Sequence, residues 1–239
     1  MKHITKPLMG TQLDWSNNLN KGLAGFWLMN EGGGDKIQDL SMNGNKGTLV
    51  GMAHPPTPAS GWNPGRKGVG LNFDGGNDYV DAGNAASLNI TNAITIEAWV
   101  KTTTITAQRN IIMKGGGTAT NYGIDIGSIA GKLRFFGYAS GVAKGIILAG
   151  GTVIDDGIWH HIAGTFDGTN WIIYRDGVVD NSKVDAATLT PTTETLQIGA
   201  RQSTGYFDGS IDEVRIYNRA LSASEIMELY INPYGMFLK

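Results

Sequence analysis

The sequence predicts an all-β protein built as one large domain. Glycine accounts for 35 of the 239 residues, about 15%, which is roughly twice its average usage. The glycines show no collagen-like period and separate short apolar runs, so they indicate tight turns between strands. Asp176-Gly177, between two apolar runs, is a strong hairpin signal because glycine accepts a positive φ without steric cost. All-β sandwiches often reach this length as a single unit.

Strand patterns recur from residue 22 to residue 217. Residues 94–100 alternate regularly, with Ile94, Ile96, Ala98 and Val100 on one face. The other expected strands cover residues 22–28, 69–73, 79–80, 111–114, 122–126, 132–138, 159–166, 171–175, 178–179, 195–200 and 210–217. Together they predict about a dozen antiparallel strands of ordinary length.

The remaining segments divide the chain into an arm, a domain and a tail. Residues 1–20 are polar and weakly patterned and are interpreted as an N-terminal arm, followed by the domain over 21–232 and a tail over 233–239. Four of the seven prolines lie in residues 51–68, which are expected to form a long surface loop.

One helix is expected near residues 222–231. Ser222 and Glu225 form a capping-box pattern, in which each side chain reaches the other residue's backbone amide. Ile226 and Leu229 then follow at helical spacing, and Pro233 ends the helix.

The composition excludes several classes of function. The net charge is −2 and the pI about 6.1, with no basic block, which argues against a nucleic-acid partner. The absence of cysteine excludes disulfides, zinc–thiolate sites and thiol catalysis. No apolar stretch has the length of a signal peptide or a membrane span, so no membrane partner is expected.

Six segments occur in an order that resembles one known family. They are FWLMNEGGG (26–34), DLSMNGNKGTL (39–49), FDGGNDYV (73–80), TIEAWV (95–100), WHHIA (159–163) and GSIDEVRIYNRALS (209–222). The set is similar to laminin-G-like (concanavalin A-like lectin/glucanase) jelly-roll domains over about residues 22–231. The resemblance implies an all-β, two-sheet antiparallel jelly-roll sandwich with one short C-terminal helix, usually a binding or structural module. Some relatives bind calcium and some bind sugars.

The ends of the chain carry a narrower resemblance. Residues 6–10 (KPLMG), 19–23 (LNKGL) and 232–237 (NPYGMF) are similar to stand-alone members of this family in tailed bacteriophages. This similarity implies a virion structural or binding protein, as a capsid decoration or a tail or fibre component, made in the host cytoplasm and released by lysis. The alternative is a lectin-like carbohydrate-binding module, with calcium as its candidate cofactor, that recognises a cell-surface glycan.

The arm is expected to contact other virion proteins or copies of this chain. Its apolar residues Leu8, Met9, Leu13 and Trp15 form no complete periodic face, so they cannot be buried within the arm itself. Docking back onto its own domain, as a strand added at a sheet edge, is the alternative.

Enzymatic activity is not expected, and a glycoside hydrolase or lyase is the least favoured function. Sugar hydrolysis needs two carboxylates that face the scissile bond from one side. Residues 94–100 provide Glu97 alone, and the adjacent Asp212 and Glu213 are expected on opposite faces of their strand. None of the common nucleophile, metalloprotease or phosphate-binding motifs is present.

Calcium is the cofactor that the polar loops favour, since it takes about six to eight oxygen ligands. Asp212 alternates in phase with Val214 and Ile216, so it is expected to face the core, where it needs a cation or backbone amides as partners. The first candidate ligand set is Glu31, Asp39, Asn43, Asn45 and Asp212, and an alternative loop provides Asp74, Asn77, Asp78 and Asp81. The competing interpretation is that these residues cap turns.

Aromatic side chains outside the strand runs are the candidate sugar contacts. Trp62, in the proline-rich loop, and Tyr206 are the predicted ligand-binding residues, because an aromatic ring covers the apolar face of a pyranose. Trp15 is a further exposed aromatic candidate, and for Trp62 packing within its own loop is the alternative.

Overall fold

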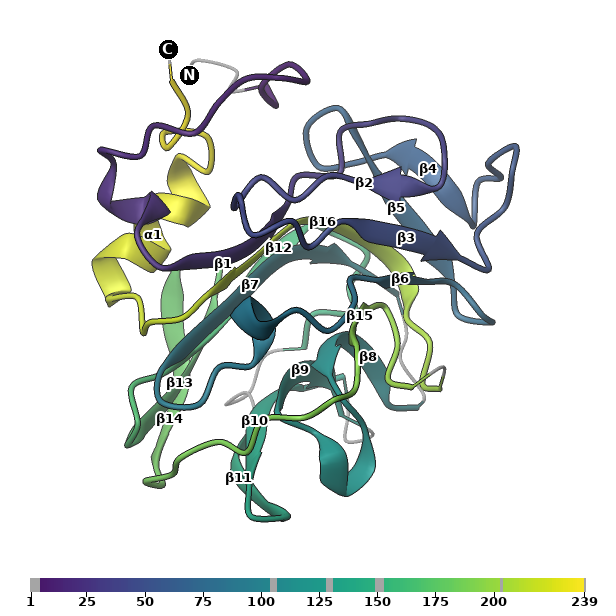
Figure 1. The fold of residues 1–239 in the computed structure, drawn as a ribbon. Coiled ribbons are helices and arrows are strands. Elements are labelled where there is room, and N and C mark those ends of the chain that lie inside the picture. Colours follow the sequence, from purple (N-terminus) through teal and green to yellow (C-terminus); the bar gives the residue numbers. More distant parts are fainter. Residues whose placement is uncertain (1–4, 104–106, 128–130, 149–152, 203, 239) are drawn as a thin grey trace.

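The computed structural model describes residues 5–103, 107–127, 131–148, 153–202 and 204–238 as two antiparallel sheets packed face to face (Figure 1). The first sheet has the order β14-β13-β12-β7-β16-β5-β4, with β1 paired to β16. Its strands are β1 (Leu23–Trp27), β4 (Gly61–Pro64), β5 (Val69–Asp74), β7 (Ile94–Lys101), β12 (His160–Phe166), β13 (Asn170–Arg175), β14 (Val178–Val184) and β16 (Asp208–Tyr217).

The second sheet has the order β11-β10-β9-β8-β15-β6-β3-β2. Its strands are β2 (Lys36–Ile37), β3 (Gly47–Val50), β6 (Tyr79–Asp81), β8 (Arg109–Lys114), β9 (Tyr122–Ile126), β10 (Leu133–Ala139), β11 (Val142–Leu148) and β15 (Leu196–Ile198). The predicted antiparallel sandwich is therefore confirmed, with β2, β3, β4 and β11 as strands that the sequence patterns did not indicate.

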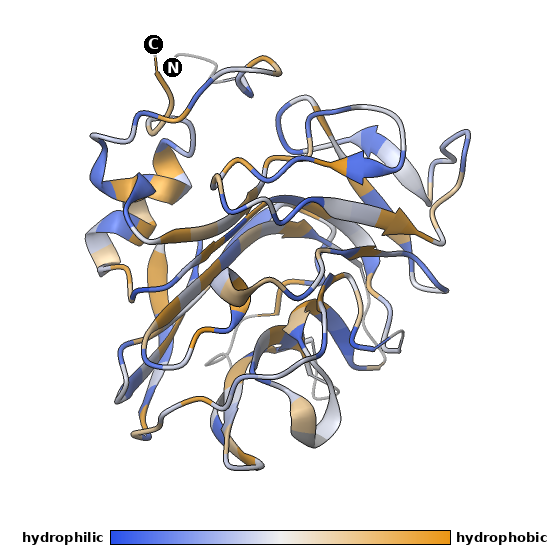
Figure 2. Cartoon of the chain, viewed as in Figure 1, coloured by the Kyte–Doolittle hydropathy of each residue, from blue (hydrophilic) through white to orange (hydrophobic). Residues whose placement is uncertain are grey.

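The main core lies between the sheets and follows the alternation along the strands, which mix apolar and polar residues (Figure 2). In β7 the side chains of Ile94, Ile96, Ala98 and Val100 enter this core, as the sequence predicts. The intervening residues Thr95, Glu97 and Trp99 therefore lie on the outer face of the first sheet. Yet these residues are also buried, so a second layer covers that face.

That layer is built from the two ends of the chain, which lie side by side (Figure 1). Leu13 and Phe237 form an isolated antiparallel bridge, and the Asp14 amide donates to the Met236 carbonyl at 2.9 Å. A second apolar cluster forms here from the arm, β1, α1 and the tail, and includes Leu13, Leu19, Leu23, Phe26, Tyr217, Ile226, Leu229, Tyr234, Met236 and Phe237. Contacts with its own domain therefore hold the arm in place, which is the alternative that the sequence left open.

The helix α1 (Ala223–Ile231) has the predicted N-terminus. Ser222 is its N-cap, and its side chain accepts from the Glu225 amide while the Glu225 side chain accepts from the Ser222 amide. In the described part of the chain, no helix is long and apolar enough to cross a membrane.

Candidate functional site

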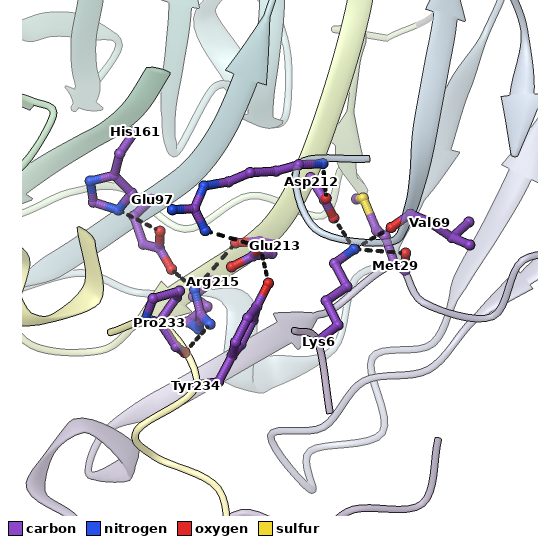
Figure 3. Close-up of polar contacts among 11 residues, drawn as sticks. Lys6, Met29, Val69, Glu97, His161, Asp212, Glu213, Arg215, Pro233 and Tyr234 are labelled. Carbon is purple, nitrogen blue, oxygen red and sulfur yellow. Dashed lines mark hydrogen bonds and ion pairs between the residues drawn. The ribbon is translucent and has the colours of Figure 1, made fainter. Parts of the chain in front are cut away.

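A group of charged residues lies buried on the outer face of the first sheet, beneath the arm and the tail (Figure 3). We call it the buried ionic cluster, and its members are Lys6, Arg66, Glu97, His161, Asp212, Glu213, Arg215 and Tyr234. It contains three carboxylates on one face, the arrangement that the sequence patterns did not lead us to expect.

Glu97 lies at the centre of one half of the cluster. The Arg215 guanidinium donates to Oε1 of Glu97 at 2.5 Å, and Nε2 of His161 lies 2.9 Å from Oε2. All three side chains are fully buried. Burial alone would raise the pKa of Glu97, but the charge of Arg215 and the hydrogen bond from His161 outweigh it and hold that pKa below its usual range. Glu97 is therefore fixed as a carboxylate.

Asp212 lies in the other half and is held by the arm. The Lys6 ammonium is 2.5 Å from Oδ1 of Asp212, and it also donates to the carbonyls of Met29 and Val69 (Figure 3). The Arg66 amide donates to Oδ2 at 2.9 Å. Burial raises the pKa of Asp212 to about 7, against the opposing charge of Lys6. The prediction that Asp212 is buried and satisfied by a cation or by backbone amides is confirmed, with an ammonium as the cation.

A bulge in β16 corrects the predicted directions of Asp212 and Glu213. Ile211 and Val214 both enter the main core, so two residues lie between them where regular alternation allows one. The pairing of β16 with β7 shifts register here, and Glu213 has a φ of 54°. Asp212 and Glu213 therefore do not lie on opposite faces, and Asp212 does not face the core. Both join Arg215 on the outer face.

Tyr234 of the tail and Arg66 cover the Glu213 side chain. The Tyr234 hydroxyl donates to Oε1 of Glu213 at 2.5 Å, and the Arg66 guanidinium lies 3.8 Å from the same oxygen. That guanidinium stacks 3.4 Å above the Trp99 ring. The three carboxylates are thus wholly buried and paired, so a polysaccharide cannot reach any of them.

Asp39, Asn43 and Asn45 of the first predicted calcium set lie in one turn, where they make hydrogen bonds to the backbone. The Asp39 carboxylate accepts from the amides of Phe26, Ser41 and Asn45 at 3.0, 2.9 and 2.8 Å. The Asn43 and Asn45 side chains donate to the Ala24 carbonyl, and Glu31 accepts from the Gln38 amide. Asp212 is engaged by Lys6 and Arg66 instead. These contacts fit the turn-capping interpretation rather than a set of oxygens open to a cation.

The alternative loop shows the same chemistry. Asp74 accepts from the Gly76 amide at 2.8 Å, Asp78 from the Asp74 amide at 3.1 Å, and Asp81 from the Gly83 amide at 2.8 Å. Asn77 lies exposed in the same turn, where its amide donates to Asp74 at 3.3 Å. Among the described residues, no group of three histidine or acidic side chains is arranged to hold a metal ion. Calcium binding stays a prediction of the sequence.

The two predicted aromatic contacts differ in accessibility. Trp62 is only 6% exposed, and its indole N–H donates to the Gly34 carbonyl at 2.9 Å. The expectation of an exposed Trp62 platform is wrong, because Gly61–Pro64 pairs with β5 and turns the ring inward. Tyr206 is half-buried, with its ring 6.4 Å from that of Tyr79, and its role in binding stays a prediction.

The outer face of the second sheet carries a groove that the sequence analysis did not identify. We call it the β10 groove; it has a volume of about 120 Å³ and is lined by Gln108, Arg134, Phe136, Tyr138, Ala143 and Arg201. Leu133 and Phe135 enter the main core, so the residues in the other phase of β10, Arg134, Phe136 and Tyr138, lie on its opposite face. The alternation over 132–138 predicts the strand and also places these three side chains on one face.

Asp125 of β9 holds two of the side chains that line the groove. The Arg134 guanidinium donates to both oxygens of Asp125, at 2.8 and 2.6 Å, and Gln108 donates to Oδ2 at 2.8 Å. Burial raises the pKa of Asp125, although these donors oppose the shift. The Phe136 and Tyr138 rings lie edge to face, 6.3 Å apart. The groove therefore combines aromatic surface with fixed hydrogen-bonding groups.

Comparisons with known proteins agree with this architecture. Residues 74–227 match the family model described as the concanavalin A-like lectin/glucanases superfamily. No curated protein sequence matches the chain.

Solved structures of three kinds are similar to it. The binding domain of Paraclostridial Mosquitocidal Protein 1 aligns with a TM-score of 0.71 at 18% identity, covering 91% of this chain and 54% of that one. Domain 4 of AbnA, a GH43 extracellular arabinanase from Geobacillus stearothermophilus, in complex with arabinotriose, gives 0.68 at 20% identity, covering 87% and 98%. Trypanosoma rangeli sialidase gives 0.62 at 19% identity, covering 91% and 34%. The chain thus spans about half of the first structure, and such identities show the fold alone.

Proposed function

Because the chain belongs to the concanavalin A-like lectin/glucanases superfamily, we propose that it is a non-catalytic module that binds saccharides through the outer face of its second sheet. The β10 groove is the observation that carries this proposal. It offers the Tyr138 ring and the Arg134 side chain on β10 beside the Gln108 side chain, which directly precedes β8. An aromatic face for the sugar ring and a few placed polar groups for its hydroxyls are what saccharide recognition requires.

The state of the acidic residues supports a non-catalytic role. A glycosidase needs one carboxyl group as acid and another as base or nucleophile, both in reach of the sugar. Here Glu97, Asp212 and Glu213 are each paired inside the buried ionic cluster and covered by the arm and the tail. Neither proton transfer to a glycosidic oxygen nor attack on an anomeric carbon is open to them.

The similarity to domain 4 of the arabinanase, whose structure contains arabinotriose, supports a saccharide as ligand. The role in a bacteriophage virion remains a proposal from the chain ends. It is compatible with a saccharide-binding face, since capsid decorations and tail fibres meet the host surface. The arm does not add support for it, because Lys6 and Leu13 dock on their own domain.

A glycan array tests the proposal directly. We expect the wild type to bind a subset of glycans, and Tyr138→Ala to lose about tenfold or more in affinity, in line with the loss of an aromatic contact. Trp15→Ala tests the competing aromatic candidate, because Trp15 is 44% exposed on the arm, outside the β10 groove, and its removal should leave binding unchanged.

The same glycans should release no new reducing ends on prolonged incubation with the protein. Binding that survives Tyr138→Ala would refute the assignment of the groove. Hydrolysis that disappears in Glu97→Gln would refute the non-catalytic assignment.

A further inference from the structure

Resting on the proposed function, we infer that the β10 groove selects an acidic saccharide unit, and that the Arg201 guanidinium binds its carboxylate. Two features of the groove lead to this: its charge balance and its size.

The charge balance leaves two guanidinium groups, those of Arg134 and Arg201, sharing one carboxylate, that of Asp125. Arg134 is 25% exposed and is neutralised by the bidentate contact with buried Asp125. The Arg201 guanidinium also acts on Asp125, since its charge opposes the rise in the pKa of that carboxyl group. The side chains that line the groove include two guanidinium groups and no carboxylate. The groove therefore carries a net positive charge after Asp125 is counted.

The backbone at Arg201 is held by local hydrogen bonds. The Arg201 amide donates to the Thr204 carbonyl and the Thr204 amide donates to the Arg201 carbonyl, both at 3.0 Å. The Thr204 hydroxyl adds a third bond to the same carbonyl at 2.7 Å. The fixed backbone sets where the side chain starts, and the planar fork of the guanidinium matches a carboxylate in a bidentate geometry.

The size of the groove limits what can enter. Its volume of about 120 Å³ is below the ~300 Å³ at which pockets for drug-sized ligands begin. A single terminal unit or side branch fits this space better than the interior of a chain. Tyr138 and Phe136 give that unit an aromatic wall, and Gln108 and Arg134 face its polar atoms.

Paired ligands that differ only in charge test the inference. Titration calorimetry would compare trigalacturonate with its methyl ester, and sialyllactose with the methyl ester of the same trisaccharide, so that the two arms distinguish a hexuronate from a sialate. We expect at least one acidic ligand to bind about tenfold or more tightly than its neutral counterpart, as for a hydrogen bond to a charged group. Arg201→Gln should remove this preference, while Tyr138→Ala should weaken the acidic and neutral ligands alike.

Lys183→Gln is the control, because Lys183 is an exposed cation on β14 of the other sheet. It should keep the preference. Equal affinity for both members of each pair, or a preference that Arg201→Gln retains, would overturn this inference and leave the proposed function standing. If neither these ligands nor any glycan on the array binds the wild type, the proposed function itself fails. The ester comparison needs no variant, so the inference stays testable if a substitution impairs folding.

Discussion

The contact between Lys6 and Asp212 joins residues 206 positions apart and fastens the arm to the sheet. Both side chains are almost fully buried, at 5% and 0% exposure. A buried pair contributes little net stability, because the desolvation of both charges offsets their attraction, but removing one partner is costly. The pair therefore fixes where the arm lies more than it stabilises the fold.

The Lys6→Met variant should show a loss of stability that grows with pH. The pKa of Asp212 is raised to about 7, so the folded protein keeps a proton that the unfolded chain releases above about pH 4. The free energy of unfolding therefore falls as pH rises through this window, and loss of Lys6 raises that pKa further. We expect a loss of about 3–5 kcal/mol at pH 8 and a loss about 1.4 kcal/mol smaller at pH 5, because pH 8 lies about one unit above that pKa.

Denaturant unfolding at both pH values measures this difference. Lys46→Met, at an exposed position, is the control and should change stability by no more than about 0.5 kcal/mol at either pH. An equal loss for Lys6→Met at pH 5 and pH 8 would show that Asp212 does not titrate as described.

Asp212 also shows how far sequence reasoning reaches at this scale. Its burial could be predicted, because it lies among apolar residues of β16. The direction of its side chain could not be predicted. A single extra residue at Glu213, with φ of 54°, shifts the alternation, and no sequence pattern indicates this bulge. Its partner could not be predicted either, since Lys6 lies in a segment without pattern.

At the scale of elements, regular alternation was the reliable signal. It placed β7 almost to the residue, as the capping box did for α1, and the alternation in β10 contained the groove residues Arg134, Phe136 and Tyr138. β4 was missed because its segment is rich in proline. It is an edge strand, however, where Pro64 removes no required hydrogen bond.

The arm packs against the tail. Leu13, at 5% exposure, pairs with Phe237, while Leu8 on the same arm is 84% exposed. This difference provides a matched pair of substitutions within one segment. Leu13→Ala should cost about 2–3 kcal/mol through lost burial and a partly filled cavity, and Leu8→Ala should cost less than about 0.5 kcal/mol.

Thermal unfolding of the two variants at the same pH checks this expectation. The melting temperature should fall clearly for Leu13→Ala and hardly at all for Leu8→Ala. Equal, small effects would mean that the arm does not pack on the domain in solution, which would restore the hypothesis that another chain holds it.

At the scale of the whole molecule, the two outer faces of the sandwich differ in kind. The face of the first sheet is covered by both ends of the chain, and its carboxylates are consumed in internal ion pairs. The outer face of the second sheet bears the β10 groove, with aromatic and basic groups held by Asp125. This difference between the two faces supports the proposal that the β10 groove is the binding site.

Amide chemical-shift mapping with the best saccharide from the array tests this division most directly. We predict that the largest shifts lie in β10, at Gln108 and at Arg201, with Glu97 and Arg215 unchanged. Shifts concentrated on β7 and β16, or on the arm and the tail, would place the ligand on the first sheet and contradict the account.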